Sequence, residues 1–215
     1  MELNIIFIII LGVVSVVYLV TLSFKPGAFQ YILKCCLMPL VLAVYISTAG
    51  FENIYWLVFL ALLFAWIGDV VLLRIADVLW FKLGLVSFLI GHIFYVIAMY
   101  KFAVPFNIPV LIISIVVSLS FCLAAYKIIK PDKQMRIPVI AYESIIMVMA
   151  IFALQLFMAH QSTFGILVFA GSICFVVSDT LLALKTFRGF RVFFAIMITY
   201  IAAQFLIAYG FTMMP

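Results

Sequence analysis

Residues 64–73 read FAWIGDVVLL and place a carboxylate, Asp69, inside an apolar run long enough to cross a membrane. An ionised side chain at membrane depth costs roughly 3 kcal/mol on insertion scales, so it rarely lies there without a partner or a function. A second stretch, FVVSDTLLAL at residues 175–184, repeats the pattern with Asp179. The two stretches predict a membrane bundle built around two aspartates.

The composition indicates an integral membrane protein. Of the 215 residues, 70% are hydrophobic and 9% are charged, whereas soluble domains average about 45–50% apolar and about 25% charged residues. The apolar runs have the length of helical spans, about 20 residues, and lack the alternation of a β-barrel. We therefore expect an all-α polytopic bundle that forms a single integral membrane domain over residues 1–215.

Eight transmembrane helices are predicted, with short connections between them. The first is expected to be a retained helix and not a signal peptide, because its apolar run is long and no basic residue precedes Lys25. Lys25-Pro26-Gly27 ends this first span. The predicted spans are residues 3–23, 29–49, 54–74, 79–100, 105–127, 138–159, 162–185 and 190–212.

The basic residues alternate between the two ends of these spans. Eleven of the twelve Lys and Arg residues lie in or beside the connections 1–2, 3–4, 5–6 and 7–8, and only Lys101 lies at the opposite end. The positive-inside rule therefore predicts that these four connections are cytoplasmic and that both termini are on the non-cytoplasmic side. The net charge of +5 then reflects basic residues in short loops that set the topology, so no nucleic-acid partner is expected.

The two aspartates also indicate an internal duplication. Each lies in the pattern Gly/Ser-Asp-x-x-Leu, with Lys34 located 35 residues before Asp69 and Glu143 located 36 residues before Asp179. Four spans per half would make a 4+4 parallel repeat, related by an axis along the membrane normal. Chance similarity is the alternative.

Polar side chains from different helices fall at shared depths. With about 1.5 Å of rise per residue, four titratable residues lie roughly 8–10 Å inside the predicted cytoplasmic boundary, which predicts a polar chamber open to the cytoplasmic leaflet. These four are Asp69, Asp179, Glu143 and Lys34, and the deeper polar residues are His92, Tyr95, Tyr200 and Gln204.

Structural roles for these residues are the alternative to a functional site. The aspartates can pair with Lys34 or cap a neighbouring helix, and Lys34 and Glu143 can extend to the interface. His92 can be a satisfied histidine inside the bundle, and Tyr200 and Gln204 can form hydrogen bonds between helices.

The polar set favours acid–base catalysis if the chain is an enzyme. Two carboxylates in different surroundings can act as acid and base, as a reaction with an oxocarbenium-like transition state requires. The sequence contains no Gly-x-Ser-x-Gly elbow, no HExxH motif and no phosphate-binding loop. Its cysteines and histidines have no metal-site spacing, so no metal ligand is assigned.

An ordered set of short motifs then points to a family. The motifs are Gly68-Asp69 with Leu72, Gly91-His92 with Tyr95, Tyr142-Glu143, Ser178-Asp179 with Leu182, and Tyr200 with Gln204. Together they resemble the YhhN-like lysoplasmalogenase family of eight-span membrane hydrolases, over roughly residues 20–210. The resemblance implies hydrolysis of the vinyl ether bond of lysoplasmalogens, which yields a fatty aldehyde and glycerophosphoethanolamine or glycerophosphocholine. It also implies that no cofactor is needed.

The resemblance carries a mechanistic hypothesis. One of Asp69 and Asp179 protonates the vinyl carbon, and the other stabilises the oxocarbenium ion and activates water; either order remains open. Lys34 would meet the phosphate of the lysophospholipid substrate. The residues predicted to bind substrate or support catalysis are Lys34, His92, Tyr95, Tyr142, Glu143, Ser178, Tyr200 and Gln204.

Three other functions compete with this one. A proton-coupled transporter of small solutes would use an intramembrane Asp/Glu/His/Lys relay, although only Pro39 interrupts a span near mid-membrane. An intramembrane aspartyl protease resembles Gly-x-Gly-Asp at one aspartate, but Trp66 occupies the place of the first glycine here. A lipid-binding scaffold gives no reason for four charges at one depth. A multi-pass protein of a bacterial inner membrane is the expected setting.

Overall fold

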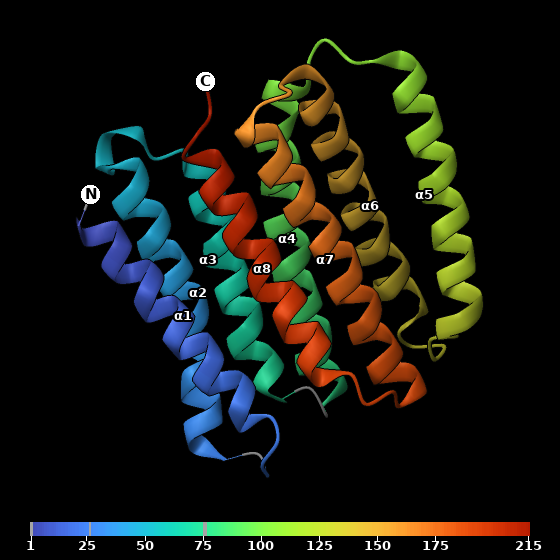
Figure 1. Cartoon of the computed structure of the whole chain (residues 1–215). Helices are drawn as coiled ribbons and strands as arrows, with labels where there is room; N and C mark the ends of the chain where they lie inside the picture. Colours follow the sequence, from blue (N-terminus) through green and yellow to red (C-terminus); the bar gives the residue numbers. More distant parts are fainter. Residues whose placement is uncertain (1, 26, 75–76) are drawn as a thin grey trace.

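The computed structural model describes residues 2–25, 27–74 and 77–215 and consists of eight long helices joined by short connections (Figure 1). Within these residues there is no β-strand. Pro26 of the predicted first break lies outside the described residues. The helices are α1 (Glu2–Thr21), α2 (Ala28–Ala49), α3 (Trp56–Val71), α4 (Val78–Ala103), α5 (Ile108–Ile129), α6 (Arg136–Ala159), α7 (Thr163–Arg188) and α8 (Phe193–Phe211).

All eight helices are long and apolar enough to cross a membrane. A helix of about 20 residues spans the hydrocarbon core and satisfies its own backbone hydrogen bonds there, which open strands cannot do. The prediction of an all-helical protein with eight spans is therefore confirmed. The chain is a multi-pass membrane protein.

The predicted boundaries differ from the helix ends by a few residues. The third span ends in a 3₁₀ turn, η2 (Leu72–Arg74), and another 3₁₀ turn, η1 (Phe51–Asn53), precedes α3. The last helix begins at Phe193, three residues later than predicted. Gly189 follows α7 with a φ of 73°, a left-handed conformation that ends a helix.

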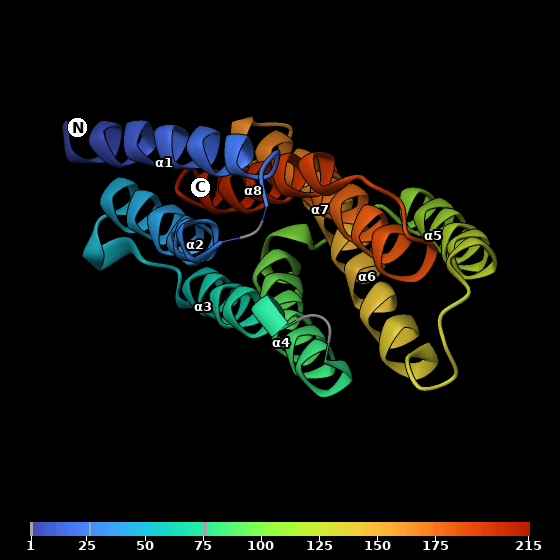
Figure 2. The same ribbon diagram turned by 90° about the horizontal axis from the view of Figure 1, so that it is seen from below.

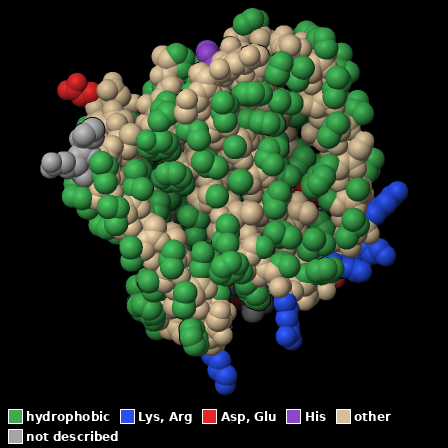
Figure 3. Space-filling view, in the orientation of Figure 1, with side chains coloured by type: hydrophobic (Ala, Val, Ile, Leu, Met, Phe, Trp, Pro, Cys, Tyr) green, Lys and Arg blue, Asp and Glu red, His purple; other side chains and the backbone are tan. Residues whose placement is uncertain are grey.

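The helices run alternately up and down, so the N- and C-termini lie at the same end of the bundle (Figure 1). Figure 3 shows Lys and Arg side chains gathered at the opposite end. We call this end the basic end, formed by the connections after α1, α3, α5 and α7. Which side of a membrane the basic end faces stays a prediction, as does the 4+4 repeat.

The interior of the bundle is formed mainly by α3, α4, α6, α7 and α8. Seen from the basic end, α1, α8 and α7 line one side, and α2, α3 and α4 the other (Figure 2). About half of the residues in the most apolar part of α4 and of α8 are buried. The helices α1 and α5 lie at the two flanks and are mostly exposed. The polar side chains therefore meet where α3, α4, α6, α7 and α8 face one another.

Close packing of α3 on α4 fixes the position of Asp69. A Cβ atom added at Gly91 would lie 3.1 Å from the carbonyl oxygen of Ala61, and one at Gly68 would lie 2.6 Å from the ring of Phe88. Small residues let helix backbones approach closely inside membranes. The residue after Gly68 is thereby held against the interior of the bundle, and Asp69 is buried.

Candidate active site

One cavity of about 390 Å³ contains both aspartates. Every helix except α5 contributes to its wall, which is otherwise largely apolar. The cavity extends to the basic end, because Gln30 and Tyr31 of the first turn of α2 and Lys185 of the last turn of α7 also line it. We call this cavity the chamber. Its polar interior residues are Lys34, Asp69, Tyr142, Ser178, Asp179 and Tyr200.

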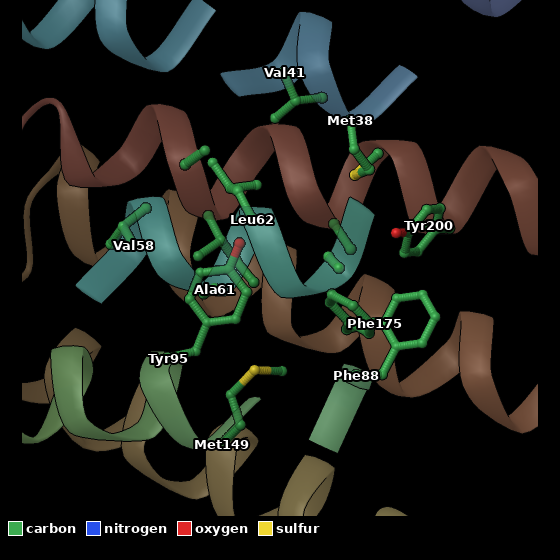
Figure 4. Close-up of a cluster of buried hydrophobic side chains, with 14 of the residues drawn as sticks. Met38, Val41, Val58, Ala61, Leu62, Phe88, Tyr95, Met149, Phe175 and Tyr200 are labelled. Carbon is green, nitrogen blue, oxygen red and sulfur yellow. The ribbon is translucent and has the colours of Figure 1, made fainter. Parts of the chain in front are cut away.

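Asp69 is held by two partners from other helices. The hydroxyl of Tyr200 on α8 donates a hydrogen bond of 2.8 Å to its Oδ2 atom, and the ammonium of Lys34 on α2 lies 3.6 Å from its Oδ1 atom. The ring of Tyr200 is packed edge-on against Phe88 and Phe175, as Figure 4 shows. Both oxygens of this carboxylate are therefore engaged, and Lys34 compensates its charge.

Asp179 has a partner of the same kind but no cation. The hydroxyl of Tyr142 on α6 donates a hydrogen bond of 2.6 Å to its Oδ2 atom. No Lys, Arg or His nitrogen in the described part of the chain lies within 4 Å of this carboxyl group. The neighbouring Ser178 donates to the carbonyl of Ile196, which ties α7 to α8. Among the described residues, Oδ1 of Asp179 has no hydrogen-bond partner and is free to meet a ligand in the chamber.

A second polar layer lies beyond the chamber, away from the basic end. The hydroxyl of Tyr95 donates a hydrogen bond of 2.7 Å to Oε1 of Gln204. Nδ1 of His92 lies 2.7 Å from the carbonyl oxygen of Phe88, and its ring packs edge-on against Tyr142. Neither His92, Tyr95 nor Gln204 lines the chamber. These three residues support the chamber wall from behind.

Glu143 lies outside the chamber. It lines a separate space of about 40 Å³, which Tyr142 and Asp179 also border. Neighbouring residues in a helix point about 100° apart, and here Tyr142 reaches the chamber whereas Glu143 does not. The structure thus brings Asp69, Asp179 and Lys34 together in the chamber. Glu143, the fourth charged residue predicted at this depth, lies behind Asp179.

Tyr18 and Lys185 are among the chamber residues that no sequence pattern singled out. Tyr18 of α1 is buried and lines the chamber, although the apolar first span offered no signal for it. Lys185 lines the chamber as well, but in the sequence it counted only as one of the basic residues that set the topology. Six residues are about 1.7 helical turns, so this spacing from Asp179 does not place the two side chains on one face and offered no signal for the chamber.

The model of the YhhN family matches residues 29–211, which include α2 to α8 almost completely. The chain belongs to the YhhN family. All ten site residues predicted from the sequence lie within the family match, whereas α1 and its Tyr18 precede it. No curated protein and no solved structure matches the chain.

Proposed function

We propose that this member of the YhhN family is a lysoplasmalogenase. It would hydrolyse the vinyl ether bond of lysoplasmenylethanolamine or lysoplasmenylcholine to a fatty aldehyde and the glycerophospho-base. The observation that carries the proposal is the pair of tyrosine-bonded aspartates in one apolar chamber, of which only one is paired with a cation. Family membership and the burial of the site in a membrane protein support a lipid substrate.

The asymmetry of the pair supports one distribution of the two roles. A cation beside a carboxylate favours its ionised form, whereas a carboxyl group without one is more easily kept neutral in an apolar site. Asp69, with Lys34 at 3.6 Å, is therefore the carboxylate. Asp179, which has only the Tyr142 hydroxyl, is the acid that delivers a proton from its free Oδ1 atom.

The reaction then proceeds in three steps. Asp179 transfers its proton to the vinyl carbon remote from the oxygen, which leaves an oxocarbenium ion and an Asp179 carboxylate. The Asp69 carboxylate stabilises the positive charge and orients a water molecule, whose oxygen adds to the oxocarbenium carbon while a proton returns to a carboxylate. The resulting hemiacetal breaks its bond to the glycerol oxygen, which takes up a proton, and the products are one aldehyde and one alcohol.

The shape of the site fits a lysolipid. The aspartates lie inside the bundle, while the chamber ends at the basic end, where a phosphate headgroup can remain near water. The leucine, phenylalanine and methionine side chains of the wall can contact the alkenyl chain. We place the protein in a bacterial inner membrane with the basic end toward the cytoplasm, in agreement with the positive-inside rule.

Matched substrates test the proposal. Purified protein in liposomes is incubated with lysoplasmenylethanolamine, with its saturated alkyl ether analogue and with its ester analogue. Only the first can form an oxocarbenium ion by protonation of a double bond, so aldehyde is expected from it and neither aldehyde nor fatty acid from the others. Fatty acid from the ester would contradict the proposal, and proton-coupled solute flux without aldehyde release would favour the transporter.

A further inference from the structure

A second lysine lines the chamber, and its charge is not used by either aspartate. Lys185 lies in the last turn of α7, half-buried, with its ammonium 3.8 Å from the centre of the Phe193 ring. Phe193 lines the chamber too. In the chain as described, no carboxylate lies within 4 Å of Lys185, whereas the charge of Lys34 is matched by Asp69. The chamber therefore holds one paired and one unpaired cation.

The unpaired cation lies between the acid and the basic end. Lys185 follows Asp179 by six residues on the same helix, a rise of about 9 Å toward the end of the bundle. In a lysoplasmalogen the glycerol backbone and one ester oxygen separate the vinyl ether oxygen from the phosphorus atom. A substrate with its double bond at Asp179 and its headgroup toward the basic end therefore brings its phosphate within reach of the flexible Lys185 side chain.

We propose that Lys185 is the residue that binds the substrate phosphate, and that it makes the chamber selective for phosphorylated lysolipids. This inference rests on the proposed function and gives to Lys185 the phosphate contact that the sequence analysis expected of Lys34, whose ammonium lies 3.6 Å from Asp69. A lysine binds phosphate as a point charge, and the Phe193 ring holds the ammonium at the chamber wall. Gln30 and Tyr31 of α2 line the same part of the chamber and can complete the phosphate contacts.

The first experiment compares two substrates that differ only in the phosphate. KM is measured with lysoplasmenylethanolamine and with the phosphate-free 1-alkenylglycerol, for the wild type and for Lys185→Gln, Lys185→Arg and Arg188→Gln. Arg188 lies in the same last turn of α7 but is exposed and does not line the chamber, which makes it the matched control.

In Lys185→Gln we expect the ratio of the two KM values, phospholipid over alkenylglycerol, to rise about tenfold, the usual loss for a charge-assisted contact. Lys185→Arg should keep most of the wild-type ratio and Arg188→Gln all of it. Turnover of alkenylglycerol by Lys185→Gln shows that this variant is folded. An unchanged ratio in Lys185→Gln, or an equal rise in Arg188→Gln, overturns the proposal.

A binding experiment separates this proposal from the proposed function. The saturated 1-alkyl lysophosphoethanolamine cannot be hydrolysed, and it is titrated against the same variants in detergent alongside 1-alkylglycerol and inorganic phosphate alone. Thermal stabilisation of the wild type by the phospholipid, lost in Lys185→Gln and kept in Arg188→Gln, supports the phosphate site even if no aldehyde is ever released. Equal stabilisation of the wild type and Lys185→Gln overturns it, and full stabilisation by inorganic phosphate alone shows a site for the free ion instead of a headgroup.

Discussion

The two aspartates of the chamber share one kind of partner and differ in another. Each accepts a short hydrogen bond from a tyrosine of another helix, Tyr200 for Asp69 and Tyr142 for Asp179. Among the residues that the structure describes, only Asp69 also has a lysine, Lys34, beside it. In the proposed mechanism, two carboxylates in similar sequence patterns thus act as a charge-compensated carboxylate and a neutral acid. The difference between them, more than their similarity, is what acid–base chemistry requires.

Replacing the proposed acid, Asp179, is expected to have the largest effect on activity. We expect Asp179→Asn to lower kcat for lysoplasmenylethanolamine by about 10³-fold, because a general acid contributes about 10²–10⁴-fold and an amide cannot supply the proton. Asp69→Asn should lower kcat by a smaller factor, about 10²-fold, by removing the stabilising charge. Aldehyde release by purified protein measures both.

Asp132→Asn, an exposed change in the loop between α5 and α6, is the control for the loss of a carboxylate and should leave kcat unchanged. If Asp69→Asn is the more damaging of the two aspartate variants, the roles are reversed. Near-normal turnover in both contradicts the mechanism altogether.

The next change makes the two aspartates alike. Lys34→Met removes the cation from Asp69, so we expect kcat to fall by about 10- to 100-fold. The thermal stability in detergent should fall as well, because the buried charge of Asp69 is left without its partner. Adding Asp69→Asn to Lys34→Met should restore the stability but not the activity. Wild-type stability and activity in Lys34→Met alone would show that the ion pair has no influence on Asp69.

Removing the hydroxyl of either tyrosine is expected to lower kcat by a smaller factor. Tyr142→Phe and Tyr200→Phe each remove one hydrogen bond to a carboxyl group, and we expect each to lower kcat about tenfold, the value of a charge-assisted hydrogen bond. Tyr126→Phe, on α5 and outside the chamber, is the control, because it makes the same change without touching an aspartate. If both interior variants retain more than half of the activity, the tyrosines do not orient the aspartates.

The smallest effect is expected behind the chamber. Tyr95→Phe removes the hydrogen bond to Gln204 in the second polar layer, which does not line the chamber. A hydrogen bond between membrane helices contributes on average about 0.6 kcal/mol, so stability should fall slightly while kcat changes less than about twofold. A tenfold loss of kcat at unchanged stability would show that the Tyr95–Gln204 hydrogen bond contributes to catalysis.

The sequence was sufficient for most of the fold and for part of the site. Helices of membrane length are visible in hydropathy because every span must be apolar, and the depth of Asp69, Asp179 and Lys34 follows from the fixed rise per residue. Rotation about the helix axis is less constrained, because α6 and α7 are apolar on most sides. For this reason depth alone could not show that Glu143 faces away from the chamber or that Lys185 faces into it.

Sequence spacing could not predict which side chains contact the two aspartates. Tyr200 bonds to Asp69 across 131 positions of the chain, and only the packing of α8 against Phe88 and Phe175 brings its hydroxyl there. Tyr142 was predicted as a support residue from a motif, yet its bond to Asp179 depends on how α6 is rotated against α7. The charge asymmetry of the pair is therefore a finding of the structure.

The proposed hydrolysis requires that the chamber protonates a vinyl ether carbon and adds water to the neighbouring carbon. It is tested most directly by incubating purified protein with lysoplasmenylethanolamine in D₂O, reducing the released aldehyde at once and locating deuterium by mass spectrometry. The account predicts a fatty aldehyde with a single deuterium on the carbon next to the aldehyde group, delivered by the acid of the chamber. Unlabelled aldehyde, free fatty acid or intact substrate would contradict it.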